Sequence, residues 1–384
     1  MKQMHYDVVV CGGGVAGVAA AVASARQGAK TVLIEKQCLL GGLATSGLIY
    51  IYLPLCDGKM TQVTFGIAEE MLKRCVEYGP FAVPEQWGGP KGGNPGCREG
   101  ALQNRYACCF SPAGFTLTLD KMLAEAGVDL WLDTLITGAD VEGRRVTAVD
   151  VANMSGSLKI TGNTFVDATG ASLVTRFAGA KVISETNYVT PWILEMSEDP
   201  SYFHFTESLH VRVFGKHAPQ YAMEPEYDGR KVTEFVRRAW QLMRDHYDAI
   251  PQEKRTLNYP VHLPVMPQIR KIAFIDAVRI LDDDDAYKPV EHCIGMGADW
   301  IKETAPGWPV PYEALIPKTL DNLFAAGRCI GASGYAWEIF RVIPNAAMTG
   351  EAAGLAAFLC SHSGISSKEL PFNKLEFLLP KCRK

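Results

Sequence analysis

The sequence predicts an α/β fold, because its first residues alternate between strand and helix patterns around a glycine-rich turn. Residues 6–11 form a Val-rich run typical of a buried strand, 15–27 are Ala-rich and closed by Gly28, and 30–35 form a second apolar run. The turn between the first strand and the helix reads Gly12-Gly13-Gly14-Val15-Ala16-Gly17. Strand, glycine turn, helix and strand in this order predict a dinucleotide-binding βαβ unit.

Three glycines of this turn each have a physical role in such a unit. Gly12 permits the tight turn, Gly14 lets the backbone approach a pyrophosphate, and Gly17 lets the helix pack closely on the strand. The helix N-terminus around Val15 and Ala16 supplies free N–H groups and a positive dipole.

The second predicted strand ends in an acidic residue, Glu35, where a carboxylate can accept hydrogen bonds from ribose hydroxyls. This acid fits an unphosphorylated ribose and disfavours NADP, while NAD and FAD both remain open for this segment. Lys36 and a second glycine turn, Gly41-Gly42-Leu43-Ala44-Thr45, follow. A nicotinamide enzyme would not need this second turn.

With these motifs the chain resembles the FAD-dependent oxidoreductases that share the glutathione-reductase type of FAD domain. The resemblance implies a Rossmann-like domain of three layers, with a central parallel sheet and a β-meander, and an inserted mixed α+β substrate domain. It also implies FAD as cofactor. No histidine stands beside Gly41 and Gly42, where some relatives attach flavin covalently, so we expect noncovalent FAD.

The resemblance continues in later segments and implies further cofactor contacts. Ala168-Thr169-Gly170 resembles a turn beside the adenosine half, and Ile136 resembles the residue that places a backbone group on the adenine. Gly327 and Arg328 resemble the segment near the ribityl chain, although many related flavoproteins have Asp where this chain has Arg328.

The segment that begins near Asn345 and Ala346, after Pro344, resembles the closing helix of the family. Its N–H groups and positive dipole would point at the flavin N1–C2=O edge. This group of proteins commonly has Thr-Cys where this chain has Asn345-Ala346, which leaves the polar contacts to the flavin open.

Two arginines are the candidate catalytic residues. Arg341 matches the family's arginine just before the closing helix, and Arg270 lies in a segment that resembles an Arg-rich strand. A guanidinium near the flavin can hold a carboxylate or stabilise reduced flavin, but it can equally bond carbonyls between domains. Tyr335 and His292 are weaker acid/base candidates.

The pattern along the chain predicts a discontinuous FAD-binding domain, residues 1–185 and 301–384, and a substrate or cap domain, 186–300. Within them we expect helices at 61–78 and 232–247. The Gly/Pro-rich loop 79–100 is either a mobile lid or a disordered excursion. His210 and Arg212 share one face of a predicted strand and face either substrate or solvent.

Charge, apolar runs and cysteine count argue against a nucleic-acid-binding, membrane-spanning or disulfide-rich protein. A net charge of −4 over 384 residues, without a Lys/Arg cluster, gives no argument for nucleic acid or an anionic membrane, and no segment has the apolar length of a membrane span. No spacing matches a metal site. The odd count of 11 cysteines predicts free thiols in a reducing cytoplasm, and a redox role for adjacent Cys108 and Cys109 is disfavoured.

No second glycine fingerprint follows residue 50, so the electrons are expected to come from the substrate directly. The leading hypothesis is a FAD-dependent dehydrogenase or oxidase that transfers a hydride from a small organic molecule to flavin N5, with an unknown electron acceptor. The alternatives are a reductase fed by an external electron carrier, a non-redox enzyme resembling thiazole synthases, and a flavin-bound protein without turnover.

Overall fold

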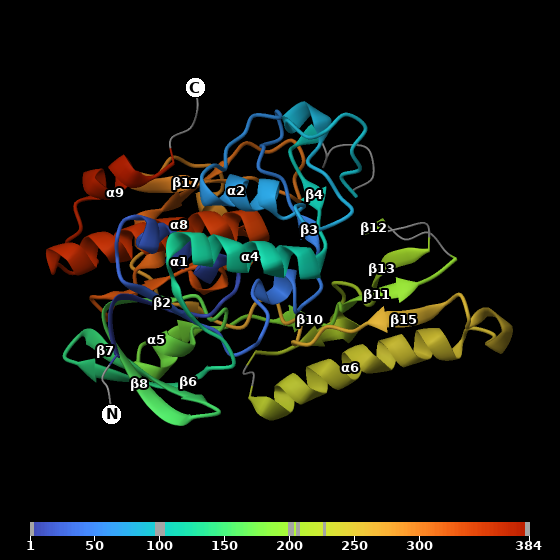
Figure 1. Cartoon of the computed structure of the whole chain (residues 1–384), viewed down its shortest axis with the longest axis horizontal. Helices are drawn as coiled ribbons and strands as arrows, with labels where there is room; N and C mark the ends of the chain where they lie inside the picture. The colour runs from blue at the N-terminus through green and yellow to red at the C-terminus, as the bar shows by residue number, and fades with distance from the viewer. Residues whose placement is uncertain (1–3, 97–103, 199–202, 205–207, 226–227, 381–384) are drawn as a thin grey trace.

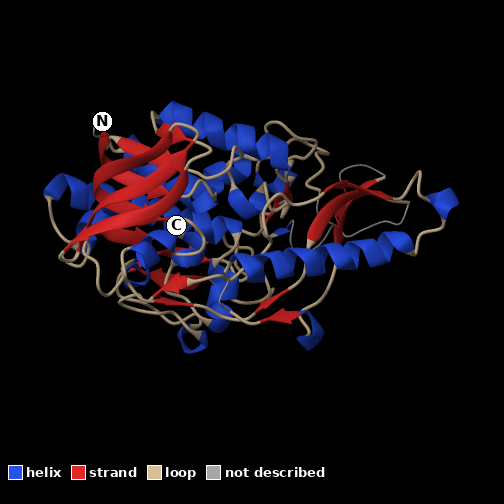
Figure 2. Cartoon of the chain, turned by 90° about the horizontal axis from the view of Figure 1, so that it is seen from below, coloured by secondary structure: helices blue, strands red, loops and turns tan. Residues whose placement is uncertain are grey.

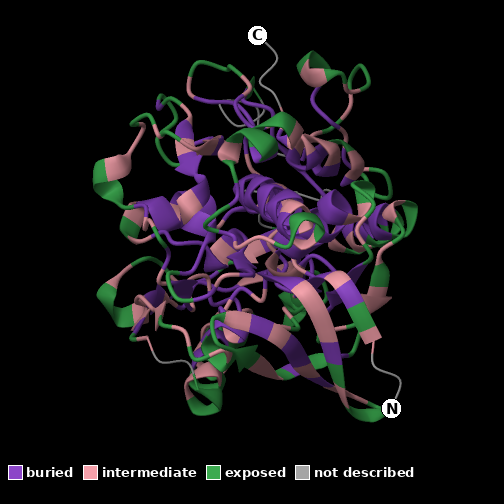
Figure 3. Cartoon of the chain, turned by 90° about the vertical axis from the view of Figure 1, so that its left-hand side faces the viewer, coloured by how far each residue is buried: buried purple, intermediate pink, exposed green. Residues whose placement is uncertain are grey.

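The computed structural model describes residues 4–96, 104–198, 203–204, 208–225 and 228–380. Figure 1 shows a larger body that holds both ends of the chain and a smaller lobe built around a long helix. Buried residues concentrate in the centre of the larger body, and exposed residues lie on its loops and outer strands (Figure 3).

The core of the larger body is a parallel sheet. Its strands lie in the order β5-β2-β1-β8, and β19 pairs with β8. The bounds are Met4–Cys11 for β1, Thr31–Ile34 for β2, Asp129–Trp131 for β5, Gly156–Asp167 for β8 and Leu323–Ala325 for β19. The second half of β1, Val8 to Cys11, and most of β2 are apolar and buried, because strands covered on both faces need apolar side chains on both. The sheet confirms the predicted α/β fold.

Strand β8 is shared between two kinds of sheet. Its last residues pair in parallel with β19, with Phe165 opposite Leu323, whereas its first residues pair antiparallel with β7, with Thr161 opposite Ala148. β7 (Arg145–Asn153) in turn pairs with β6 (Leu135–Glu142) through a tight turn. This is the predicted β-meander.

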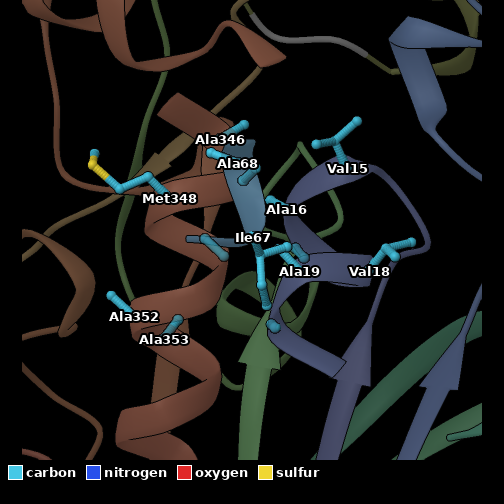
Figure 4. Packing of buried hydrophobic residues seen from close by; sticks show 14 of the residues in the cluster. Val15, Ala16, Val18, Ala19, Ile67, Ala68, Ala346, Met348, Ala352 and Ala353 are labelled. Atoms are coloured by element: carbon cyan, nitrogen blue, oxygen red, sulfur yellow. The ribbon is translucent and has the colours of Figure 1, made fainter. Parts of the chain in front are cut away.

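Two helices pack closely on one face of the parallel sheet. They are α1 (Val15–Arg26) and α8 (Ile343–Ser363). A Cβ on Gly350 would lie 2.2 Å from Ala16 O, and one on Gly354 would lie 2.2 Å from Ala20 O. The absence of these Cβ atoms lets the two backbones touch. Figure 4 shows alanines of both helices, with Ile67 of a third helix, at this contact.

The third helix, α2 (Ile67–Arg74), is shorter than the predicted 61–78. The preceding residues leave the helical path because the N–H groups of Val63 and Thr64 both donate to Leu55 O, at 2.9 and 3.1 Å. Gly66 then adopts a positive φ of 69° before the helix begins. The predicted extent of the helix was therefore wrong: the residues before Ile67 form a turn, although the sequence pattern had placed them in the helix.

The smaller lobe is a four-stranded antiparallel sheet covered by a long helix. The strands lie in the order β12-β13-β11-β15, and α6 (Gly229–Asp248) runs along them, as Figure 2 shows. Glu195 links the two, since it accepts a hydrogen bond from Tyr247 of α6 at 2.7 Å and pairs with Arg212 at 2.6 Å. The strands are Phe203–His204, Leu209–Val213, Trp192–Met196 and Tyr259–His262 for β12, β13, β11 and β15.

Shorter elements complete the fold. The helices are α4 (Pro112–Ala126), α5 (Leu173–Phe177), α7 (Gly334–Phe340) and α9 (Phe372–Leu378). The paired strands are β3 (Ile51–Tyr52) with β4 (Cys108–Cys109), β9 (Val182–Ile183) with β16 (Phe274–Ile275), β10 (Asn187–Tyr188) with β14 (Ala222–Met223), and β17 (Cys293–Gly297) with β18 (Trp308–Pro311).

The described part of the predicted 79–100 loop, up to residue 96, is packed against the larger body. Phe81 and Val83 are buried in its core, and Trp87 stacks on Tyr106 with ring centroids 4.7 Å apart. Residues 97–100 lie outside the described residues. Among the described helices, none alone has the length and apolarity to cross a membrane; α7 and α8 pass that test together but are bent by 86°.

Candidate functional site

A long cleft opens where β1, β2 and β8 end, and we call it the main cleft. It has about 980 Å³ of empty space, counted to its open mouth. The carboxyl ends of parallel strands are where α/β folds bind ligands. Most of the residues predicted to bind the cofactor line it: Gly12, Gly14, Val15, Ala16, Glu35, Lys36, Gly41, Gly42, Leu43, Ala44, Ala168, Thr169, Gly170, Gly327, Arg328 and Ala346.

The glycine turn fits a pyrophosphate. Gly14 lines the cleft, and a Cβ on it would meet no atom within 4 Å. The backbone at Gly14 is therefore directly accessible from the cleft. Gly12 has a φ of 106°, and a Cβ on it would lie 2.6 Å from Ala168 O. Gly17 does not line the cleft; a Cβ on it would lie 1.8 Å from Gly12 O. The turn thus offers N–H groups at the start of α1 to an anion.

Glu35 holds this turn in place. Its Oε2 accepts a hydrogen bond from Gly13 N at 2.6 Å, and its Oε1 accepts one from Gln37 N at 2.9 Å. Burial raises the pKa of the Glu35 carboxyl, and the two N–H groups offset part of that rise. A carboxylate oxygen has more than one lone pair, so each oxygen of Glu35 can still accept from a ribose hydroxyl.

The second glycine turn is joined to the first. Gly41 N donates to Gly13 O at 2.8 Å, and Gly14 and Gly41 form an isolated parallel bridge. Gly41 has a φ of 100°. Thr45 does not line the cleft; its hydroxyl donates to Leu40 O and so stabilises the second glycine turn. The two turns therefore form one continuous wall.

The turn at Ala168–Gly170 is held by a buried acid, Asp167. Its carboxylate accepts from the Thr169 hydroxyl at 2.7 Å and from Thr175 N and Oγ1, both at 2.9 Å. Burial raises the pKa of Asp167, although these donors oppose the rise. Gly170 has a φ of 70°, and a Cβ on it would lie 2.3 Å from Nη2 of Arg328.

Two arginines bring positive charge to the lining of the main cleft. Arg328 and Arg341 line it together with Ile343 and Ala346 of the first turn of α8. Burial lowers the pKa of Arg328 to about 10, which leaves the guanidinium charged at neutral pH. The N-terminus of α8 adds the positive end of its helix dipole.

Arg341, a predicted catalytic residue, is oriented by an acid one helical turn earlier. Its Nε donates to Glu338 at 2.8 Å, and its Nη2 forms an ion pair with the same carboxylate. Lys271 Nζ also lies 3.3 Å from Glu338. Burial acts to raise the pKa of Glu338, but Arg341 and Lys271 outweigh it and hold the pKa below its ordinary value.

Arg270, the other predicted catalytic residue, does not line the main cleft. Its Nη1 donates to Thr190 Oγ1 at 2.7 Å and its Nη2 to Thr190 O at 3.0 Å. Burial lowers its pKa to about 9, and the charge of Arg341 adds to that effect. No ion pair joins Arg270 or Arg328 to a carboxylate among the described residues, so this region carries more positive than negative charge.

The weaker candidates also lie away from the cleft lining. Tyr335 donates to Asp299 at 2.7 Å, and His292 forms an ion pair with Glu313. Arg212 pairs with Glu195, and His210 lies buried at 3.1 Å from Ser197 O, so neither faces the main cleft. Ile136 packs in the core of the meander, and the Asn345 amide donates to Ile339 O at 2.7 Å.

Sequence reasoning missed several lining residues. Gln37 and Leu173 adjoin predicted motifs, and Ala326 and Ile272 lie inside segments that resemble family motifs, but Met266 and Pro267 belong to no motif. The run Pro264-Val265-Met266-Pro267 is the one signal that marks this segment, because two prolines fix an extended backbone. Within the described residues, no group of three or more His, Cys, Asp or Glu side chains could hold a metal ion.

Solved structures share this fold. A geranylgeranyl bacteriochlorophyll reductase-like protein from Thermoplasma acidophilum has a TM-score of 0.52 and 16% identity, with 98% of this chain and 83% of that chain covered. A p-nitrophenol 4-monooxygenase from Pseudomonas putida has a TM-score of 0.51 and 11% identity, with 98% and 89% covered. At these identities the likeness concerns the fold alone. No curated protein matches the chain.

A family model gives the stronger result. The model described as FAD dependent oxidoreductase matches residues 7–265 and 289–379, which is most of the chain. The matched segments include both glycine turns, Glu35, Arg328 and Arg341, and the bare backbone at Gly14 fits the pyrophosphate of this cofactor. The chain therefore belongs to the FAD-dependent oxidoreductase family and is an enzyme that uses FAD.

Proposed function

We propose that the protein is a FAD-dependent dehydrogenase or oxidase that oxidises a small organic molecule. The observation that carries this proposal is the surplus of positive charge in the lining of the main cleft, from Arg328, Arg341 and the N-terminus of α8. Fixed positive charge at the place where negative charge develops favours electron acceptance there. The sequence lacks a second glycine fingerprint for a nicotinamide cofactor, which supports the substrate as electron donor.

The residues of the main cleft divide the binding of the cofactor among them. Glu35 would accept from the adenosine ribose, the backbone at Gly14 and the start of α1 would bind the pyrophosphate, and the wall at Gly41 and Gly42 would follow the chain beyond it. FAD in this cleft would supply the acceptor for a hydride from the substrate. Cofactor contacts by Lys36, Ile136 and Asn345 stay predictions.

Arg341 is the residue that we assign to substrate handling. The Glu338 carboxylate holds its Nε and Nη2 atoms, which fixes the guanidinium plane at the cleft wall. A fixed guanidinium can orient an anionic substrate and offset negative charge during the reaction. Arg270 lies behind the lining and donates to Thr190, so we assign it a supporting role through its positive charge.

The proposal is tested by anaerobic mixing of FAD-loaded protein with candidate substrates while the flavin absorption is followed. Rapid bleaching by a substrate without any added reductant is expected. Arg341→Ala should slow the bleaching at least tenfold (about 1.4 kcal/mol), and Arg341→Lys should restore part of the rate, because it keeps the charge. Arg237→Ala, on the exposed side of α6, is the matched control.

Unchanged flavin reduction and turnover in fully FAD-loaded Arg341→Ala would overturn the role of Arg341. If no substrate bleaches the flavin but chemically reduced protein passes electrons to an organic acceptor, the protein is a reductase instead. Absence of flavin from the purified protein would remove both redox assignments.

We also infer a reducing compartment, the cytoplasm. Cys75 and Cys108 are both free thiols, although their sulfur atoms lie only 3.9 Å apart. Thiols this close persist unpaired where the surroundings are reducing. Mass spectrometry of alkylated protein, taken directly from cells, checks the thiol state.

A further inference from the structure

A second cavity adjoins the main cleft, and we call it the α6 cavity. It has about 670 Å³ of empty space. One wall is a face of α6 that includes Phe235, Ala239 and Met243, and the other is the segment 264–268. Nearly all of its lining is apolar, and such a cavity gains free energy by taking up an apolar group.

The two cavities share a wall. Met266 and Pro267 line both the main cleft and the α6 cavity. The main cleft and the α6 cavity are therefore neighbours, and Met266 and Pro267 lie between them. Met has a flexible unbranched side chain that adapts to different shapes, which suits a residue between two compartments.

The segment 264–268 is tied to the cofactor side of the main cleft. Val265 N donates to Ser46 O at 2.9 Å, and the Gln268 amide donates to Gly47 O, just after the second glycine turn. Gln268 Oε1 accepts from Trp192 N at 2.7 Å. These bonds occupy the polar groups of Gln268, so what remains for an occupant of the α6 cavity is apolar surface.

The mouth of the α6 cavity is exposed and apolar. Trp240 is 43% exposed and Val265 is 57% exposed, and both line the cavity. These two side chains extend the apolar lining of the α6 cavity to the protein surface. The main cleft, which Met266 also lines, has the positive charges of Arg328 and Arg341 in its wall.

We propose that the substrate is an amphipathic organic anion, with its anionic group at Arg328 and Arg341 and its apolar body in the α6 cavity. This inference rests on the proposed function for the reaction, but the binding site can be tested without turnover. It assigns the α6 cavity to specificity: the guanidiniums select the anion, and the cavity selects the length of the apolar body.

The test measures the affinity of FAD-loaded protein for a series of straight-chain carboxylates, from propionate to decanoate, by titration calorimetry. Each added methylene should tighten binding about fourfold until the cavity is filled, since a buried methylene contributes about 0.8 kcal/mol. Val265→Asp places a charge at the mouth without removing the backbone bond of Val265 to Ser46, and it should abolish the dependence on length.

Val261→Asp is the matched control, because Val261 is 47% exposed on the preceding strand β15 and does not line the cavity. Ala239→Phe is a second variant that fills the cavity with bulk and should lower the affinity for the long carboxylates only. A thermal melt of each variant verifies that it is folded.

Affinity that does not change with chain length overturns the proposal, as does an equal loss in Val265→Asp and Val261→Asp. Length-dependent binding without flavin reduction by any organic anion would support the site and contradict the proposed function. Flavin reduction by short and long substrates with equal affinity would contradict the site and support the proposed function.

Discussion

The guanidinium of Arg328 lies directly against the backbone of Gly170, so that a Cβ on Gly170 would stand 2.3 Å from Arg328 Nη2. These residues come from segments far apart in the chain, after β8 and after β19. Arg328 Nη1 also donates to Ile269 O at 2.5 Å, which anchors the group from the other side. The position of a positive charge in the main cleft thus depends on the absence of one methyl group.

Gly170→Ala should therefore displace Arg328 and weaken FAD binding. Part of its effect is backbone strain, because Gly170 has a φ of 70°. Gly179→Ala is the matched control: Gly179 has a φ of 74°, and a Cβ on it would meet no atom within 4 Å. We expect both variants to lose on the order of 1 kcal/mol of stability. Only Gly170→Ala should lose FAD affinity, measured by flavin fluorescence; equal retention of FAD would contradict the role of the contact.

Glu35→Gln should loosen the cofactor end of the main cleft. The amide keeps one oxygen acceptor, so either Gly13 N or Gln37 N loses its partner. An unsatisfied buried donor costs about 1 to 3 kcal/mol, and FAD affinity should fall by at least tenfold. Equilibrium dialysis against FAD measures the change. Glu142→Gln, at the exposed end of β6, serves as the control, and a fall of the same size there would refute the assignment.

The stability of the protein should depend on pH through Glu351 of α8. Burial raises the pKa of this carboxyl to about 7, although Ile67 N donates to it at 2.9 Å. The folded state then holds the proton more tightly than the unfolded state, so its contribution to stability is full below the unfolded pKa and is lost as the pH rises through about 7.

Chemical unfolding at about pH 5 and about pH 8 checks this expectation. The free energy of unfolding should fall by on the order of 2 kcal/mol between them because of Glu351. Glu351→Gln should show a smaller fall, since its amide does not titrate. A variant with the same pH dependence as the parent protein would show that Glu351 titrates normally.

The contact of α1 with α8 should not tolerate a single added methyl group. Gly350→Ala would place a Cβ 2.2 Å from Ala16 O, and the helices would have to move apart. Overpacking of this kind costs about 1 to 3 kcal/mol, and thermal unfolding measures it. Gly229→Ala, at the start of α6 with open space around its Cβ, is the control and should be neutral or slightly stabilising.

The parts of the cofactor site that the sequence could predict are those built by short segments. The roles of Gly12 and Gly17 and the position of Glu35 follow from one βαβ unit, in which strand, turn and helix are contiguous. Their geometry depends on local backbone conformation, and sequence patterns record local conformation well. The β-meander was predicted for the same reason.

The residues that could not be predicted lie where distant segments meet. Met266 joins the main cleft only because Val265 and Gln268 bond to the loop after the second glycine turn. Arg212 faces Glu195 and Tyr247 because α6 covers that side of the sheet, which strand alternation alone does not reveal. Contacts between separate elements, such as the bond from Gln268 to Gly47 across 221 residues, leave no periodic signal in the chain.

The pairing of β8 with β7 at one end and with β19 at the other has a consequence for the synthesis of the protein. The meander pairs β8 with a neighbour in sequence and can form early, whereas its parallel partner β19 and the helix α8 leave the ribosome much later. The sheet and the lining of the main cleft are complete only when these late segments have been synthesised, because Arg328 and Ala346 belong to them. Until α8 is nearly translated, the nascent chain therefore exposes the edge of β8 at Phe165 and Val166 that later pairs with β19. Chaperones that bind during synthesis should bind at that edge.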